Sequence, residues 1–91
     1  LSTKLAPYWW TNFNNLGVTL EAAGDATGAA EAYKIAIENG HYYLAYENYA
    51  RFLIITNQLQ EAKKFLNEAT KQFPHNQTLQ EFANYLAKQL K

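Results

Sequence analysis

The fold of this chain is decided by one short stretch, Phe13-Asn14-Asn15-Leu16-Gly17-Val18-Thr19-Leu20. Its large side chains and its glycine recur at steps of three, one and three positions, at Phe13, Leu16, Gly17 and Leu20. That spacing is typical of one face of an amphipathic helix. The helix is predicted to run from about residue 8 to residue 23, because Gly24 is placed to end it in the left-handed conformation.

Four more helices are predicted after this one, separated by short turns. The second begins after the cap-type residue Asp25 and ends at Gly40. The third and fourth cover about residues 42–56 and 59–73, and the fifth follows Asn76, a residue type that caps helix N-termini. No stretch alternates with a period of two for long enough to predict a strand, so the fold class is all-α.

The pattern repeats when the chain is shifted along itself so that Phe13 falls on Tyr46. The set Phe13, Leu16, Gly17, Leu20 then falls on Tyr46, Tyr49, Ala50, Leu53 and, after a second equal shift, on Leu79, Phe82, Ala83, Leu86. The turn and the second helix match in the same way, residue by residue: Gly24 with Asn57, Ala29 with Ala62, Tyr33 with Leu66, and Ala36 with Ala69. Small residues let two antiparallel helices approach closely, while the large ones fill the grooves beside them. Because one helix pair cannot bury both of its faces, the pairs are expected to stack.

These motifs resemble the tetratricopeptide repeat family, whose pattern is W-x2-L-G-x2-Y, then A-x3-F, then P, at about 34 residues. The matching residues are Leu16-Gly17-x2-Leu20 and Ala29-x3-Tyr33, then Tyr49-Ala50-x2-Leu53, Ala62-x3-Leu66 and Pro74. The chain departs from the pattern because no Trp opens either motif, Ala50 replaces the glycine and His41 stands where proline is expected.

The resemblance implies a right-handed α-solenoid of antiparallel helix pairs, forming one domain over residues 1–91. Its two repeats would cover residues 8–41 and 42–75, followed by a C-terminal capping helix over residues 76–91. Residues 1–7 are interpreted as the tail of a helix belonging to a preceding repeat, which would make the chain part of a larger protein.

Composition excludes several classes of function. Eight Lys and Arg balance eight Asp and Glu, and this zero net charge argues against nucleic-acid binding. The longest run of large aliphatic or aromatic residues, 52–55, is too short to insert across a membrane. The chain has no cysteine and shows no signal peptide, which leaves both cytoplasm and periplasm open as locations.

No catalytic residue, cofactor or metal ion is expected. His41 and His75 each lie in the turn after a second helix, with no cysteine to complete a metal site. Asp25, the only aspartate, is placed to cap a helix, and Gly24-x3-Gly28 follows no strand, so it is not a phosphate loop. The chain is therefore not predicted to be an enzyme.

The resemblance places binding on the inner face of the first helices, which in this family line a concave groove for a peptide or a partner helix. Once the packing residues are removed, the candidate peptide-binding residues are Asn14, Asn15, Val18, Leu44, Glu47, Asn48, Arg51 and Asn84. Asn15 and Asn48 are one repeat apart, and a carboxamide can pair with both N–H and C=O of an extended peptide. Alternatively, these two amides form hydrogen bonds within the scaffold. A clamp for acidic peptide tails is not expected, because Glu81 stands where a cation would be needed.

A structural role is the alternative function. Aromatic residues begin the first helices of both units, at Tyr8, Trp9, Trp10, Tyr42 and Tyr43. They are expected to pack against a preceding repeat, and without that repeat this N-terminal edge would be exposed and could form a homodimer.

Overall fold

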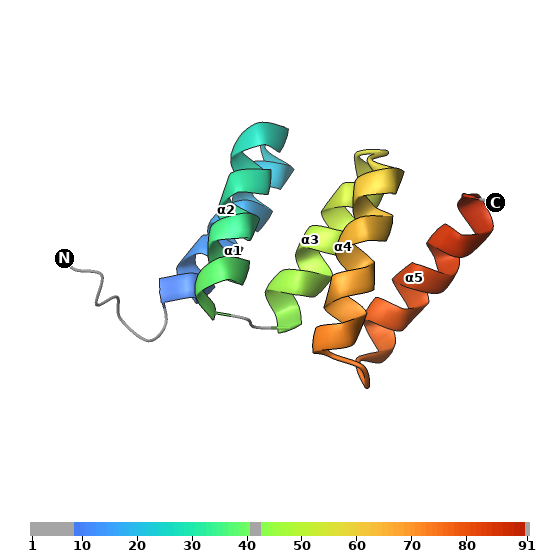
Figure 1. Ribbon diagram of the computed structural model, residues 1–91. Coiled ribbons are helices and arrows are strands. Elements are labelled where there is room, and N and C mark those ends of the chain that lie inside the picture. The colour runs from blue at the N-terminus through green and yellow to red at the C-terminus, as the bar shows by residue number, and fades with distance from the viewer. Residues whose placement is uncertain (1–8, 41–42, 91) are drawn as a thin grey trace. The chain divides into compact units, whose positions relative to one another are not determined.

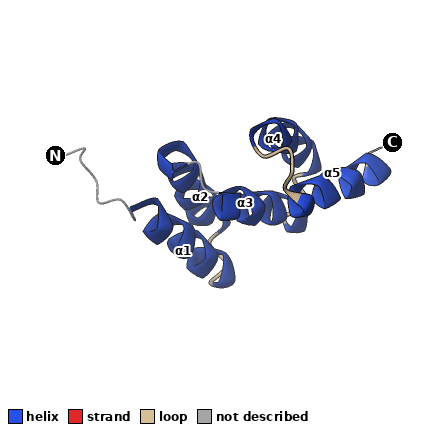
Figure 2. Cartoon of the chain, turned by 90° about the horizontal axis from the view of Figure 1, so that it is seen from below, coloured by secondary structure: helices blue, strands red, loops and turns tan. Residues whose placement is uncertain are grey.

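The computed structural model describes the backbone of residues 9–40 and 43–90, and the side chains of residues 12–38 and 43–90. Five helices form this part of the chain: α1 (Trp9–Ala22), α2 (Ala26–Gly40), α3 (Tyr43–Ile55), α4 (Leu59–Gln72) and α5 (Gln77–Gln89) (Figure 1). The predicted bounds that fall on described residues agree with these within one residue, whereas the predicted starts at residues 8 and 42 lie outside the described residues. Figure 2 shows helices and the loops that join them, with no strand in the described residues.

The chain divides into two compact units, residues 1–48 and residues 49–91. The division falls within α3, between Asn48 and Tyr49. None of the helices in the described part of the chain is both long enough and apolar enough to span a bilayer.

In the first unit, a tight turn joins α1 to α2 and makes them an antiparallel hairpin (Figure 1). Gly24 has a φ of 88°, and its N–H donates to the carbonyl of Glu21 at 3.1 Å. The next N–H, of Asp25, donates to the carbonyl of Leu20 at 2.9 Å, which completes the hydrogen-bond pattern of a Schellman motif. Asp25 then caps α2, because its Oδ1 accepts a hydrogen bond from the Gly28 N–H at 3.0 Å.

The closest approach of α1 and α2 is at Gly17. A Cβ atom at this position would lie only 2.7 Å from Cδ1 and Cε1 of the Tyr33 ring, a distance that real Cβ atoms essentially never show. Tyr33 is completely buried, and its hydroxyl donates to Oε1 of Glu21 at 2.7 Å. The small residue of the repeat motif thus leaves the space that the large residue of the second helix occupies.

The turn between α3 and α4 in the second unit has the same construction as the first turn, at the equivalent place in the next repeat. Asn57 takes the place of Gly24, with a φ of 63° and its N–H donating to the carbonyl of Ile54 at 3.0 Å. The N–H of Gln58 donates to the carbonyl of Leu53 at 2.8 Å. The same backbone bonds at equivalent positions show that the sequence repeat is also a structural repeat.

The core of the second unit is formed by α3, α4 and α5. The ring of Tyr49 on α3 meets the ring of Phe65 on α4 edge-on, with the ring centres 4.8 Å apart. Asn76 caps α5 as predicted, since its Oδ1 accepts a hydrogen bond from the Leu79 N–H at 2.9 Å. The fully buried residues of this unit come from all three helices and include Ala50, Ala62, Leu66, Ala69 and Leu79.

Two tyrosines in the cores have altered acidity. Burial raises the pKa of Tyr46. The pKa of Tyr49 is raised mainly by burial and to a lesser extent by the negative charge of Glu61. A raised pKa favours the neutral hydroxyl, so both groups stabilise the fold at neutral pH and lose that contribution as the pH rises past about 10.

The backbone conformation of Asn57 leads to a stability prediction. Replacing Asn57 by alanine is expected to lower the free energy of unfolding by about 1 kcal/mol, since alanine lacks the short polar side chain that lets asparagine adopt a φ of 63°. Asn57→Gly is expected to be neutral or stabilising, because glycine adopts this conformation readily. Urea unfolding followed by circular dichroism measures both variants. An equal loss for Gly and Ala would assign the effect to the asparagine side chain and contradict the backbone explanation.

Candidate functional site

A pocket of about 290 Å³ lies between α3 and α5 within the second unit. It is called here the α3–α5 pocket, and its lining residues are Arg51, Ile54, Ile55, Glu81, Phe82 and Tyr85. Four of these six side chains are aliphatic or aromatic, so the pocket is an apolar surface with charged groups at its margin.

The α3 side of the pocket follows from the run of four apolar residues at positions 52–55. Successive residues of an α-helix point about 100° apart, so four in a row cannot all face one core. Phe52 and Leu53 are buried, Ile54 is half-buried and Ile55 is 58% exposed. The run therefore supplies more apolar surface than the core of this unit covers.

The α5 side contributes two aromatic residues three positions apart, which places them on one face of the helix. Phe82 is half-buried, whereas Tyr85 is 46% exposed. Large exposed apolar side chains that gather at one pocket mark a binding surface more often than scattered ones do. Ile55 is 58% exposed, so burial of the rest of this side chain by a ligand would contribute about 1–2 kcal/mol.

The charged groups of the pocket are one cation and one anion. Arg51 is half-buried, and Glu81 is exposed and accepts a hydrogen bond from Nε2 of Gln77 at 3.4 Å. Since the two charges balance, the pocket does not favour a strongly acidic or strongly basic ligand.

The amides selected from the sequence have different surroundings in the first unit. Nδ2 of Asn48 donates to Oδ1 of Asn14 at 3.1 Å, and Asn14 is buried. Asn15 is exposed, and its backbone carbonyl accepts a hydrogen bond from the Thr19 hydroxyl at 3.0 Å. One N–H of Asn48 thus serves the scaffold, while its second N–H and its oxygen provide further hydrogen-bonding capacity.

The other predicted binding residues differ in exposure. Val18 and Leu44 are exposed apolar residues, Glu47 is half-buried, and Asn84 is exposed on α5. Of the eight predicted residues, the α3–α5 pocket includes Arg51 alone. The remaining pocket residues were not among them, although the apolar run at 52–55 was the signal that could have indicated Ile54 and Ile55.

Several predictions fall outside the described residues. These concern residues 1–7, Tyr8, His41, Tyr42 and the side chains of Trp9 and Trp10, and they include the N-terminal aromatic edge. Among the side chains that the structure describes, no group of three or more His, Cys, Asp or Glu residues could hold a metal ion. His75, in the turn before α5, is exposed.

The fold and the site together define a class: an array of antiparallel helix hairpins with an apolar pocket and no metal-binding cluster in its described part. A family model described as tetratricopeptide repeat matches residues 20–85. The chain therefore belongs to the tetratricopeptide repeat family and has the fold class of the helical repeat solenoids. Repeats of this family mediate protein–protein interaction and are non-catalytic modules. Comparison with curated proteins and with solved structures found no significant match.

Proposed function

We propose that this chain is a protein-interaction module that binds a peptide segment of a partner protein, with one large apolar side chain of the peptide seated in the α3–α5 pocket. The observation that carries the proposal is the presence of two exposed apolar side chains, Ile55 and Tyr85, in one pocket. Membership of a family of interaction modules supports the same function.

The pocket suits a single anchoring side chain of the partner. A space of about 290 Å³ with aliphatic and aromatic walls fits a Leu, Met or Phe side chain better than a charged one. Interfaces commonly gain most of their free energy from a few such anchors in apolar pockets. Balanced charges on Arg51 and Glu81 favour a peptide of mixed or zero charge, so its affinity should depend only weakly on salt.

The polar peptide contacts selected from the sequence in the first unit stay a prediction for that unit by itself, apart from the α3–α5 pocket. The second N–H and the oxygen of Asn48, and the exposed carboxamide of Asn15, could pair with the backbone of a bound segment. Each such hydrogen bond would contribute about 0.5–1.5 kcal/mol, less than the apolar anchor.

The test uses a library of short random peptides displayed on phage, selected against the chain and then remeasured as synthetic peptides. Enriched peptides are expected to share one large apolar residue. Tyr85→Ser is expected to weaken their binding by about tenfold, since it removes a partly exposed wall of the pocket.

A matched control is available on α3. Tyr43 is 43% exposed, close to the 46% of Tyr85, but it does not line the α3–α5 pocket. Tyr43→Ser is therefore expected to leave peptide binding unchanged. Equal losses for the two variants, or selected peptides without a common apolar residue, would refute the pocket as the anchor site.

A further inference from the structure

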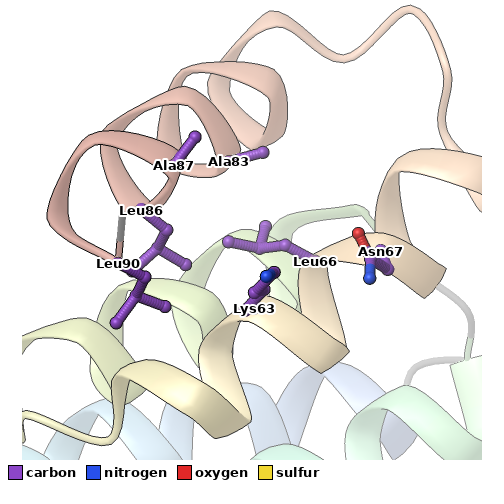
Figure 3. A pocket seen from close by; sticks show the side chains of 7 residues that line it. All are labelled: Lys63, Leu66, Asn67, Ala83, Leu86, Ala87 and Leu90. Carbon is purple, nitrogen blue, oxygen red and sulfur yellow. The ribbon is translucent and has the colours of Figure 1, made fainter.

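A second pocket lies between α4 and α5 and uses a different face of α5. Its volume is about 280 Å³ (Figure 3). From α4 it receives Leu66, Asn67 and Lys63, from α5 it receives Ala83, Leu86 and Ala87, and Leu90, the residue directly after α5, completes it. It is called here the α4–α5 pocket.

The pocket has a buried apolar floor and a margin of small residues. Leu66 and Leu86 are each 1% exposed and lie on facing sides (Figure 3). Ala83 and Leu90 are half-buried, and Ala87 is exposed. The surface of α5 around the floor is therefore apolar, and its short alanine side chains allow the backbone of another helix to approach closely.

The internal repeat of this chain indicates what fits there. Ala83 occupies the motif position of Gly17 and Ala50, one repeat further along the chain than Ala50. Gly17 is buried against Tyr33 of α2, and Ala50 is completely buried. Ala83 is the one member of this set that is not buried. In the first unit, the residue that packs against this position is Tyr33, a large side chain of the second helix of the pair.

We propose that the α4–α5 pocket binds an amphipathic helix of another protein, which packs against α5 as α2 packs against α1. The bound helix would place a large apolar side chain opposite Ala83, with small residues one turn away on each side. Tyr33 of α2 has this arrangement, with Ala29 and Ala36 buried beside it. This interaction is separate from the peptide binding proposed for the α3–α5 pocket.

The charge at the margin favours a different protein over a second copy of this chain. Lys63 is exposed, is the one charged residue lining the pocket and forms no ion pair with any described residue. A second copy docked face to face would bring two Lys63 cations and no pocket-lining anion into one interface, and like charges at an interface oppose association. An acidic residue on a partner helix would instead pair with this cation.

The probe is a synthetic peptide with the sequence of residues 25–40, acetylated and amidated at its ends. It contains the helix that packs against α1 and carries Asp25, Glu31 and Glu38 against one cation, Lys34. Its binding to the intact chain is measured by calorimetry at physiological salt. The same peptide with Tyr33→Ala is expected not to bind, because its large apolar residue is missing.

Two pairs of variants of the intact chain locate the binding site. Lys63→Glu is expected to weaken binding at least about tenfold, whereas Lys64→Glu, one position along and outside the pocket, is expected to change it less than about threefold. Ala87→Arg, which fills the pocket from an exposed helical position, is also expected to weaken binding at least about tenfold. Its control is Ala22→Arg, the same change at an exposed alanine of α1. Circular dichroism establishes that all variants remain folded.

The outcomes separate the proposal from its alternatives. Binding that Lys63→Glu and Ala87→Arg weaken, and that Tyr85→Ser leaves unchanged, supports a helix-binding pocket distinct from the α3–α5 pocket. Absence of binding at about 1 mM peptide, or equal losses for Lys63→Glu and Lys64→Glu, overturns it. A dimer in sedimentation that Ala87→Arg dissociates, with no peptide binding, would assign the surface to self-association and also overturn the proposal.

Discussion

Tyr33→Ala is expected to lower the free energy of unfolding by about 3–5 kcal/mol, the range for replacing a buried aromatic residue by alanine. Tyr33 has no exposed surface, and its ring fills the space left by Gly17 on α1. Glycine has no side chain that could extend into the resulting cavity, so the cavity should persist. For a chain of this length the loss is a large fraction of a total stability of about 5–14 kcal/mol.

Tyr33→Phe is the matched control, since it keeps the ring and removes only the hydroxyl. That hydroxyl donates to the Glu21 carboxylate at 2.7 Å, and a hydrogen bond to a charged group contributes about 1.5–3 kcal/mol. Urea unfolding monitored by circular dichroism should therefore rank the chains as wild type, then Tyr33→Phe, then Tyr33→Ala. If both variants lost the same amount, the hydroxyl and not the packed ring would account for the effect.

The fold could be predicted from the sequence because each repeat contains both the small and the large residue that pack against each other. The small residue at Gly17 and the large one at Tyr33 return one repeat later as Ala50 and Leu66. In the first unit this pair is the contact that sets the distance between α1 and α2. The turns were predictable for a similar reason, since Gly24 is of the residue type that best tolerates a positive φ and adopts one.

The α3–α5 pocket was harder to predict, since exposure depends on which helices cover a residue. The repeat places Phe82 among packing positions, yet Phe82 is only half-buried and lines the pocket. Spacing alone gives no indication of whether a packing face is fully covered. Ile55 and Tyr85 are exposed for the same reason, because the helix positions them but no described neighbour covers them.

The asparagines illustrate a different limit of the sequence. A strict period relates Asn15 to Asn48, but the side chain that bonds Asn48 is that of Asn14, one position earlier. A period relates equivalent positions in two repeats, whereas a hydrogen bond joins the positions that face each other. Equivalent positions of two repeats therefore form a hydrogen bond only when the two helices face each other with no shift along their axes.

Substitution of Gly17 by a large residue is expected to destabilise the chain, although glycine within a helix usually lowers the free energy of unfolding relative to alanine. Replacing a helical glycine by alanine ordinarily gains about 0.5–1 kcal/mol. Here a Cβ would lie 2.7 Å from the Tyr33 ring, so Gly17→Ala should show no gain. Gly17→Leu should cost about 3 kcal/mol, at the upper end of the usual range for overpacking.

Combining Gly17→Leu with Tyr33→Ala tests whether these two residues are in direct competition for one space. The added leucine can occupy the volume that the tyrosine ring vacates, so the double variant should lose at least about 1 kcal/mol less than the sum of the single losses. Residues that do not touch would instead give additive losses. Additive urea-unfolding energies would therefore contradict the close crossing of α1 and α2 at Gly17. A positive coupling would establish the small–large pair as the contact that the repeat preserves.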